Sequence, residues 1–344
     1  MQPLVSILLP CYNAEKYLKY SLDSILNQDY KNLEILCIND GSTDSTLEIL
    51  NVYRSADQRI VIIDNETNLG LINSLNKALK LVKGDYFARM DADDFSASDR
   101  ISKQISFMQA TPSIDLVSSA YNYFFFEDQK RAYVPSIAIK PNALKFLSLF
   151  CTPLTHASVL GKSSLIQKGL YIYDKNYPYA EDYELFSRLA WNGVKMSTMK
   201  ESLYWVRLHG ESVSVKYNDV QFQTNLKIIE RNIFNFMGTP IALDDSLKGL
   251  LACRVNSVIS YSQIKKAFSI FNGCLNKMKS ELDGEDINEI NSYLLAHKLN
   301  IIIQVNKKRF SLLGVKNIPF FIRSLFLMNP KQFSLLFNKL KKAS

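Results

Sequence analysis

The sequence predicts an α/β protein in which a mostly parallel sheet carries helices on both faces and a helical C-terminal region follows. Short apolar runs rich in β-branched residues alternate with segments of helical periodicity over the first 125 residues. Polar clusters directly follow three of these runs, and the last third of the 344 residues is strongly basic. Apolar strands that alternate with helices form parallel sheets that are buried on both faces.

The predicted elements follow one another in a regular order. Strands are expected at Val5–Leu9, Leu33–Ile38, Ile60–Ile63, Tyr86–Met90 and Leu116–Phe126. Helices are expected at Ala14–Asn27, Ser45–Arg54, Leu71–Leu81, Arg100–Gln109 and Glu181–Trp191. The second helix opens on a capping-box pattern, Ser45 with Glu48.

Composition limits the class of protein. Hydrophobic residues make up 47% of the chain and charged residues 22%, with a net charge of +8, which is typical of a globular protein. Five separated cysteines without a CxxC pair argue against a disulfide scaffold or a cysteine zinc site, and they fit a reducing compartment. No apolar run reaches the roughly 18 residues of a spanning helix, and the apolar start Leu4–Pro10 is expected to be a strand rather than a signal peptide.

Polar residues follow the first two predicted strands, where a parallel sheet binds its ligands. Pro10, Tyr12 and Asn13 come after the first strand, and Asp40 comes after the second. A tyrosine ring can stack on a nucleobase, and a fixed carboxylate can accept the N3–H of uracil, which cytosine lacks. The alternative interpretation is that Asp40 begins a turn that only leads into a capped helix.

Three carboxylates, Asp91, Asp93 and Asp94, stand within four residues directly after the fourth strand. They repel one another unless a cation lies between them. A Mg²⁺ or Mn²⁺ ion held by one or two carboxylates and by substrate phosphates would supply that charge. The alternative is an acidic turn that caps a helix, with Arg100 neutralising one member.

A second pair of carboxylates, Glu181 and Asp182, opens a predicted helix. At about 100° per residue, Asp182 falls within the apolar stripe of this helix and Glu181 lies near its edge. That stripe consists of Leu185, Phe186 and Leu189. An inward-facing carboxylate needs a partner or performs chemistry, and the alternative is a first-turn carboxylate that the helix dipole favours.

Together these segments resemble glycosyltransferase family 2, the inverting nucleotide-sugar enzymes of the GT-A fold. The resemblance extends from about Val5 to Ser214 and rests on six motifs in order: VSILLPCYNAEKYL, INDGSTDST, NLGLINSLNKAL, ARMDADD, AEDYELFSRLAWNG and WVRLHGESVS. It implies that the nucleotide-sugar site consists of Pro10, Tyr12, Asn13, Asp40, Asn76, Asp91, Ala92 and Arg207. One position departs from the family pattern, because Leu75 stands where many relatives carry an arginine, so the task of that arginine passes elsewhere.

The resemblance also implies a mechanism. Asp182 would be the general base, which deprotonates the acceptor hydroxyl as that oxygen attacks the anomeric carbon opposite the departing UDP. Asp93 and His209 would hold Mn²⁺ or Mg²⁺, which neutralises charge on the leaving diphosphate. Glu181 and His156 would shape the acceptor or sugar pocket. A purely structural role is the alternative for both histidines.

Basic residues dominate the C-terminal region. Residues 215–344 hold 19 basic and 9 acidic residues, and no acidic residue follows Glu289. A helix is expected after Asn329-Pro330, with Phe and Leu on one face and lysines opposite. This pattern predicts peripheral contact with an anionic bacterial membrane, and the alternative is a helix packed on the catalytic domain. The chain has no nucleic-acid-binding signature, so nucleic acid is not expected as a partner.

The sequence therefore predicts a cytoplasmic enzyme on the inner face of the bacterial cell membrane. Residues 1–215 would be the GT-A catalytic domain, with 1–125 binding the nucleotide and 126–215 the acceptor, and 216–344 would be the basic helical region. The expected reaction moves a hexose or N-acetylhexosamine from a UDP-sugar to a saccharide, linked to a polyprenyl diphosphate, in O-antigen, capsule or lipooligosaccharide synthesis. The alternatives are a non-catalytic nucleotide-sugar-binding protein and a dinucleotide-binding oxidoreductase, which needs a GxGxxG turn that the chain lacks after its first strand.

Overall fold

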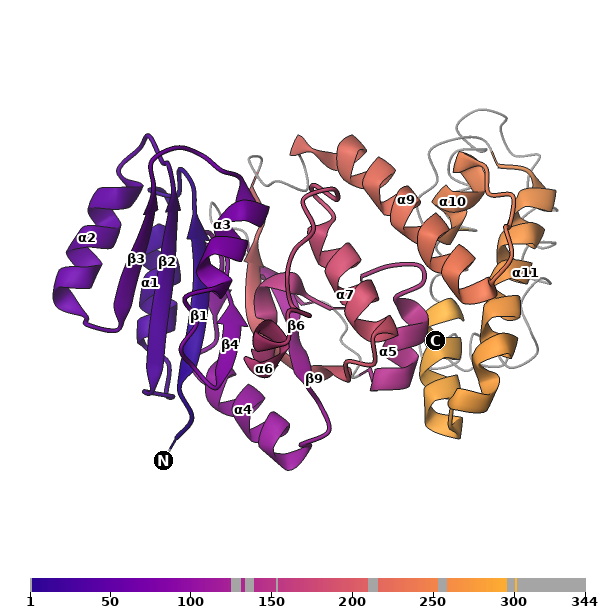
Figure 1. Cartoon of the computed structure of the whole chain (residues 1–344), viewed down its shortest axis with the longest axis horizontal. Helices are drawn as coiled ribbons and strands as arrows, with labels where there is room; N and C mark the ends of the chain where they lie inside the picture. The colour runs from indigo at the N-terminus through magenta and orange to yellow at the C-terminus, as the bar shows by residue number, and fades with distance from the viewer. Residues whose placement is uncertain are drawn as a thin grey trace. The chain divides into compact units, whose positions relative to one another are not determined.

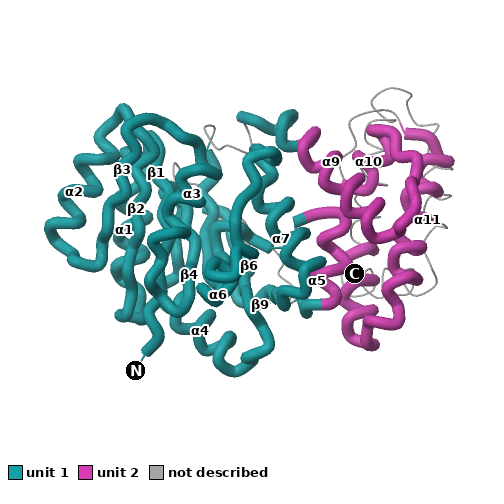
Figure 2. The backbone as a smooth tube through the Cα atoms, viewed as in Figure 1, with its two compact units in different colours: residues 1–141, 152–221 teal, residues 142–151, 222–344 magenta. Residues whose placement is uncertain are grey.

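The computed structural model describes residues 2–124, 131–133, 139–152, 154–209, 216–252, 259–295 and 301, with only the backbone described for 131–133. The chain divides into two compact units, 1–141 with 152–221 and 142–151 with 222–344 (Figure 2). The segment 142–151 belongs to the second unit although its chain neighbours belong to the first. The predicted helix after Asn329-Pro330 lies outside the described residues.

The first unit is built on a mixed sheet (Figure 1). In the described residues this sheet has nine strands in the order β3-β2-β1-β4-β8-β6-β9-β5, with β7 paired to β6. Their bounds are β1 Val5–Cys11, β2 Leu33–Asp40, β3 Ile60–Asn65, β4 Tyr86–Arg89, β5 Phe95–Ser96, β6 Leu116–Phe124, β7 Arg131–Tyr133, β8 Leu160–Lys162 and β9 Met196–Arg207.

The N-terminal half of this sheet is parallel, and the other half combines the parallel pair β6 and β9 with antiparallel neighbours. β1 pairs in parallel with β2 and β4, and β2 pairs in parallel with β3. β8 runs antiparallel to β4 and β6, and β5 runs antiparallel to β9. The predicted α/β architecture with a mostly parallel sheet is confirmed, and the antiparallel neighbours β5, β7 and β8 are short strands that need no crossover helix to mark them in the sequence.

Helices cover both faces of the parallel half. The helices of the first unit are α1 Leu18–Leu26, α2 Thr46–Ala56, α3 Leu71–Leu79, α4 Arg100–Ala110, α6 Ser164–Gln167 and α7 Glu181–Trp191. Alternate residues of a strand point to opposite faces. Ile7 and Ile35 therefore share a buried cluster with Leu22 of α1, whereas α3 packs on the other side of β1 and β2. Each fully buried side chain of this size contributes roughly 1.5–3 kcal/mol.

The helix α2 begins differently from the prediction. The Ser45 side chain makes no capping hydrogen bond, and Asp44 Oδ1 instead accepts one from the backbone N–H of Thr46 at 3.0 Å. The predicted capping box is wrong, because Ser45 has φ −74° and ψ 15° and lacks the extended backbone that aims a capping side chain at the helix. The N–H of Ser45 donates to Glu15 Oε2 at 3.0 Å, which ties α2 to the loop after β1.

The described part of the second unit is helical. It contains most of α5 (Pro141–Leu147) and α9 (Asn218–Met237), with α10 (Asp245–Leu251), α11 (Tyr261–Met278) and residues 284–295. Asn232 of α9 donates to the Ser148 carbonyl at 3.0 Å, and the rings of Phe150 and Phe271 pack with centroids 4.7 Å apart. Within the described residues, no helix combines the length and hydrophobicity needed to cross a membrane.

Candidate active site

Three loops meet at one edge of the sheet. β2, β1 and β4 are adjacent and parallel, so their carboxyl ends lie side by side (Figure 1). Tyr12, Asp40 and Asp91 therefore leave the sheet at the same edge. Ligands of parallel sheets bind at such an edge.

Asp91, Asp93 and Asp94 form a compact acidic cluster after β4. One carboxylate oxygen from each residue lies within 4.8 Å of the others. Asp94 is buried, and it accepts hydrogen bonds from the Arg207 backbone N–H at 2.8 Å and from the Tyr204 hydroxyl. Burial and then the charge of Asp93 raise the pKa of Asp94, and the same two causes raise the pKa of Asp91. The cluster therefore holds more negative charge than the surrounding protein neutralises.

Arg89, the last residue of β4, is the cation beside this cluster. Its Nη2 lies 2.6 Å from Asp91 Oδ1, and its side chain is only 4% exposed. Its Nε is buried without a hydrogen-bond partner among the described residues. Among the described residues Arg100 makes no ion pair with the turn, so the alternative in which it neutralises one member is not seen as a direct contact. Arg100 is buried beneath the sheet instead, and its Nη2 donates to the carbonyl oxygens of Arg89 and Val159 at 2.8 and 3.3 Å.

Two residues at the end of β9 contact the acidic cluster from a distant part of the chain. His209 Nε2 lies 2.9 Å from Asp93 Oδ2, and its ring packs against Tyr17 at 5.1 Å between centroids. Arg207 Nε donates to the Asp93 carbonyl at 2.6 Å. Its guanidinium lies 4.5 Å from the Tyr17 ring centroid and 5.3 Å from that of Phe124. Arg207 thereby holds the turn in place, and its contact with the nucleotide-sugar stays a prediction.

The donor set of this cluster fits a hard divalent cation. Carboxylate oxygens and an imidazole nitrogen are ligands that Mn²⁺ accepts, and Mg²⁺ prefers the carboxylates. The side chain of Asp93 is 38% exposed and that of His209 is 17% exposed, whereas Asp94 is buried with its oxygens engaged. Asp93 and His209 are thus accessible to an ion, as is Asp91 with a side chain that is 34% exposed, and their assignment as metal ligands stays a prediction. The raised carboxyl pKa values beside them mark a place where added positive charge is favourable.

Asp40 lies at the end of β2 and is 4% exposed. Its Oδ1 accepts three hydrogen bonds at 2.7 to 3.0 Å, from Asn65 Nδ2, Ser74 Oγ and the backbone N–H of Leu69. Its Oδ2 accepts one, from the backbone N–H of Gly70 at 3.0 Å. Each carboxylate oxygen has two lone pairs, so Oδ1 is fully used and Oδ2, which accepts one bond, has a second lone pair. The predicted contact with uracil stays a prediction that this acceptor site could accommodate.

Gly41 lets the loop after β3 pass directly over the end of β2. It has φ +64°, and a Cβ at this position would lie 2.4 Å from the carbonyl carbon of Thr67. Only glycine combines this backbone angle with such a close approach. Asp40 and Gly41 therefore fix the position of the 65–70 loop together.

The loops after β1 and β2 are joined by hydrogen bonds. The backbone N–H of Asn13 donates to Ser42 Oγ at 3.1 Å, and Asn13 Oδ1 accepts from the Thr43 N–H at 2.9 Å. Asn13 has φ +48°, a left-handed conformation that asparagine tolerates better than most residues. Its side chain thus shapes the loop, while Tyr12 is 51% exposed and Pro10 is half-buried beside it.

Glu181 and Asp182 begin α7. Asp182 Oδ1 accepts a hydrogen bond from the Tyr183 N–H at 2.7 Å, and the side chain is half-buried. Burial raises the pKa of Asp182, and burial followed by the charge of Asp182 raises the pKa of Glu181 to about 7. The guanidinium of Arg89 lowers the pKa of both carboxyls, so the pair shares the electrostatic environment of the acidic cluster.

The burial of this pair differs from the helical-stripe prediction. Glu181 is 7% exposed and is the more buried of the two, although the periodicity places Asp182 in the stripe. Tyr183 and Glu184 are also buried, so the first turn of α7 is covered on most of its circumference. The position of a carboxylate relative to the apolar stripe therefore does not predict which of the two is more buried.

His156 belongs to a chain of buried hydroxyls. Its Nε2 lies 2.7 Å from Tyr173 Oη, which lies 3.2 Å from Tyr171 Oη. Burial and then the charge of Arg89 lower the pKa of His156 well below its usual value, so its ring is neutral at pH 7. Asn76 holds the backbone of Tyr173 through hydrogen bonds at 2.9 and 3.0 Å. Asn76 thus positions Tyr173, the hydrogen-bond partner of His156. Its contact with the nucleotide stays a prediction, as does that of the buried Ala92.

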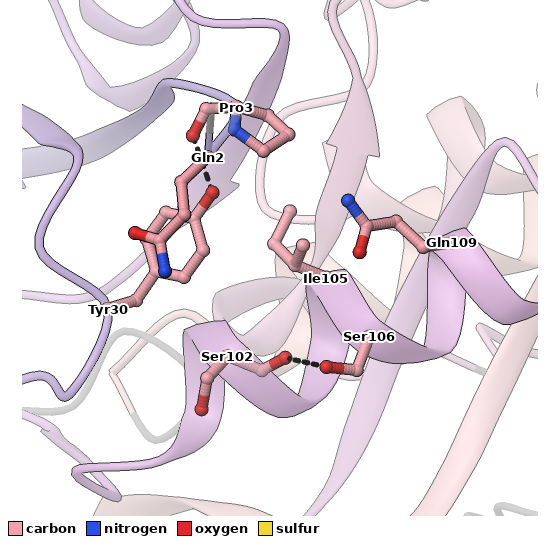
Figure 3. A pocket seen from close by; sticks show the side chains of 7 residues that line it. All are labelled: Gln2, Pro3, Tyr30, Ser102, Ile105, Ser106 and Gln109. Atoms are coloured by element: carbon pink, nitrogen blue, oxygen red, sulfur yellow. Dashed lines mark hydrogen bonds between the residues drawn. The ribbon is translucent and has the colours of Figure 1, made fainter.

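A separate cavity of about 420 Å³ opens elsewhere on the first unit (Figure 3). It is lined by Gln2, Pro3, Tyr30, Ser102, Ile105, Ser106 and Gln109. The Tyr30 hydroxyl donates to the Pro3 carbonyl at 2.5 Å. Because these two residues precede β2 and β1, the cavity lies at the amino ends of the strands, and its lining has no charged side chain. It therefore does not suit a nucleotide diphosphate.

Comparison with known proteins identifies the family. The family model described as Glycosyl transferase family 2 matches residues 6–170. An uncharacterized glycosyltransferase of Haemophilus influenzae is 34% identical over 306 residues, which cover 86% of this chain and 91% of the relative. The chain belongs to glycosyltransferase family 2. Another relative, the Escherichia coli UDP-Glc:alpha-D-GlcNAc-diphosphoundecaprenol beta-1,3-glucosyltransferase WfaP, is 30% identical over 65% of this chain and 85% of its own length.

Solved structures share the fold of this family 2 chain. S. aureus TarS 1–349 in complex with UDP-GlcNAc gives a TM-score of 0.56 at 17% identity, over 99% of this chain and 92% of that one. The mannosyltransferase PcManGT from Pyrobaculum calidifontis, in complex with GDP-Man and Mn²⁺, gives 0.54 at 16% identity, over 94% and 86%. The GT-A fold that the motifs predict is confirmed.

Sequence reasoning missed two residues of this glycosyltransferase site. Arg89 could have been found from the sequence, because a charged residue inside an apolar strand needs a buried partner. No sequence pattern points to Tyr204, since its role depends on β9 lying beside the acidic cluster. Its buried hydroxyl accepts a hydrogen bond from the Asp91 N–H at 3.1 Å and bonds to the Asp94 carboxylate.

Proposed function

We propose that this family 2 member transfers a hexose or N-acetylhexosamine from a UDP-sugar to a saccharide acceptor, with inversion and with Mn²⁺ or Mg²⁺. One observation carries the proposal. The acidic cluster after β4 and the Glu181–Asp182 pair of α7, which are far apart in sequence, both interact with the guanidinium of Arg89. A place for a diphosphate with its cation is thus combined with a carboxylate base.

The donor would bind at the carboxyl ends of β1, β2 and β4. The exposed ring of Tyr12 would stack on uracil, and Asp40 Oδ2 would accept the uracil N3–H. Asp93 and His209 would hold the divalent ion, which when bound neutralises the charge that develops on the leaving diphosphate. Arg207 keeps the acidic cluster in one conformation through its bonds to Asp93 and Asp94.

Asp182 would take the proton of the acceptor hydroxyl. Burial raises its pKa, which makes it a stronger base than an exposed aspartate, and the guanidinium of Arg89 opposes this shift and favours the ionised form. The backbone N–H of Tyr183 fixes Oδ1 and leaves Oδ2 to receive the proton. The acceptor oxygen would bond to the anomeric carbon as the bond from that carbon to UDP breaks on the opposite side, so the configuration inverts.

Relatives and composition support the finer assignments. WfaP is named for UDP-glucose and a diphosphoundecaprenol-linked GlcNAc, and TarS holds UDP-GlcNAc. We therefore propose a polyprenyl-diphosphate-linked acceptor, in the synthesis of O-antigen, capsule or lipooligosaccharide. The excess of basic residues in 215–344 supports peripheral contact with the anionic inner face of the cell membrane. PcManGT holds GDP-Man, so the base preference of this chain depends on its own residues rather than on the fold.

A thermal-shift panel tests the proposal. UDP-, GDP- and dTDP-sugars are each added with and without Mn²⁺. We expect stabilisation by UDP-sugars that is larger with the metal, because a ligand at a hundredfold excess over Kd adds about 2.7 kcal/mol. Binding of no nucleotide sugar would remove the transferase assignment, and equal shifts with and without Mn²⁺ would remove the metal. The anomeric configuration of the product, read by NMR, tests inversion.

A further inference from the structure

Tyr179 has an unusual backbone conformation directly before α7. Its φ is +63°, in the left-handed region that bulky residues rarely adopt. The Tyr179 carbonyl accepts a hydrogen bond from Gln221 Nε2 at 2.8 Å, and the next N–H, that of Ala180, donates to the Tyr177 carbonyl at 3.3 Å. Hydrogen bonds on both sides of the residue therefore hold this conformation in place.

The ring of Tyr179 is one of a flat pair. Tyr179 stacks on Tyr217, which directly precedes α9, with centroids 4.2 Å apart and planes only 13° apart. Both side chains are half-buried, so part of the two-ring surface is open to solvent. Both residues belong to the first unit, the one that carries the candidate active site.

The stacked pair lies near the carboxylates that begin α7. Tyr179 lies two residues before Glu181, and burial followed by the neighbouring Tyr217 and Glu181 raises the pKa of Tyr179. In an inverting displacement the base and the acceptor lie on the side of the anomeric carbon opposite the diphosphate. In the proposed function the donor is anchored at the acidic cluster after β4, so a surface beside the carboxylate pair would lie on the acceptor side.

We propose that Tyr179 and Tyr217 form the platform on which a pyranose ring of the acceptor stacks. This inference rests on the proposed function. The C–H hydrogens on one face of a pyranose form an apolar, weakly positive surface, which matches the negative face of a tyrosine ring. The platform is assembled before the acceptor arrives, which reduces the entropy lost on binding.

The test measures saccharide binding separately from donor binding. Saturation-transfer NMR with the full chain, UDP and Mn²⁺ would measure the affinity for methyl α-glycosides of N-acetylglucosamine, glucose, galactose and mannose. We expect Tyr217→Ala to weaken the best glycoside about 3- to 10-fold, the range of an aromatic stacking contact. Calorimetry should show UDP affinity unchanged, and Tyr217→Phe, which keeps the ring, should retain glycoside binding.

Two further variants keep the test sharp. Tyr179→Gly removes the other ring and accepts φ +63° without strain, so it folds even if Tyr217→Ala does not, and it should weaken the glycoside similarly. Phe234→Ala is the control: it removes an aromatic side chain of α9 that is 49% exposed, and it should change neither glycoside affinity nor UDP affinity. Glycoside binding that is equal in wild type and both tyrosine variants, or absent from wild type, overturns the platform. A loss of UDP affinity in Tyr217→Ala overturns it too, since the rings would then serve the donor. Failure of the proposed function appears separately, as absent UDP-sugar binding by the wild type.

Discussion

Replacing Arg89 with methionine should destabilise the first unit and make its stability more sensitive to pH. The substitution keeps an unbranched side chain in a strand position that is 3% exposed and removes only the guanidinium. Asp91 then keeps a carboxylate that is 34% exposed on its side chain and faces two other carboxylates without its ion-pair partner.

The magnitude follows from the two ends of this ion pair. Removing one partner of a fully buried pair costs about 3–5 kcal/mol. Asp91 is about one-third exposed, so we take the low end of this range for the loss in the free energy of unfolding. Removing the buried Nε, which has no hydrogen-bond partner among the described residues, offsets about 1 kcal/mol of that loss. The net loss is therefore about 2 kcal/mol. For a unit of this size that corresponds to a melting temperature lower by roughly 4–8 °C.

The pH dependence has a definite sign. Burial already raises the pKa of Asp91, and without Arg89 it rises further, as do the pKa values of Glu181 and Asp182. A carboxyl whose pKa is raised in the folded state stabilises below its unfolded pKa and loses that contribution as pH rises through the folded value. The melting-temperature difference between wild type and Arg89→Met should therefore be larger at pH 8 than at pH 5.

Differential scanning fluorimetry from pH 5 to 8, without divalent metal, is the assay. The double variant Arg89→Met/Asp91→Asn is the control, because it removes the stranded charge and should recover most of the lost stability. Equal melting temperatures for wild type and Arg89→Met, a difference that does not change with pH, or a double variant no more stable than the single one would each refute this account of the ion pair.

Four other substitutions or truncations have clear expected outcomes. Asp93→Asn should abolish the strengthening of UDP binding by Mn²⁺ in calorimetry, and an unchanged metal effect would remove Asp93 from the metal site. Asp182→Asn should keep UDP-sugar affinity and lose transfer by about 10²–10⁴-fold, whereas lost donor binding would make it a donor ligand. The wild-type rate should also fall below about pH 7, where the Glu181–Asp182 pair takes up a proton, and a rate that stays level to pH 5 would contradict this. Gly41→Ala should lower the free energy of unfolding by roughly 2–4 kcal/mol in denaturant titrations, since its Cβ would meet backbone at 2.4 Å, and a near-neutral change would show that the loop after β3 can yield. Truncation after Leu327 should release the protein from anionic liposomes, and unchanged sedimentation would remove the membrane contact.

The sequence predicted the first half of the fold because its signals are local. Apolar strands and amphipathic helices alternate there, and right-handed crossovers leave few ways to arrange them. It gave no sign of β8 or of the short β5, because these strands pair antiparallel with neighbours that are distant in the chain. The predicted capping box at Ser45 was also wrong, since Asp44 and the loop after β1 fix the start of α2 instead.

By itself the sequence determined the family, the parallel half of the sheet and the presence of an acidic cluster after β4, because each is a pattern within a short segment. Only the tertiary structure decided what those residues contact. The partner of Asp91 is Arg89 rather than Arg100, Asp40 has most of its acceptor sites taken by the chain, and Tyr179 lies against Tyr217. The residue that pairs with a buried charge depends on which backbone segments are brought together by folding. These segments can be distant in the sequence, so sequence neighbours alone do not identify the partner.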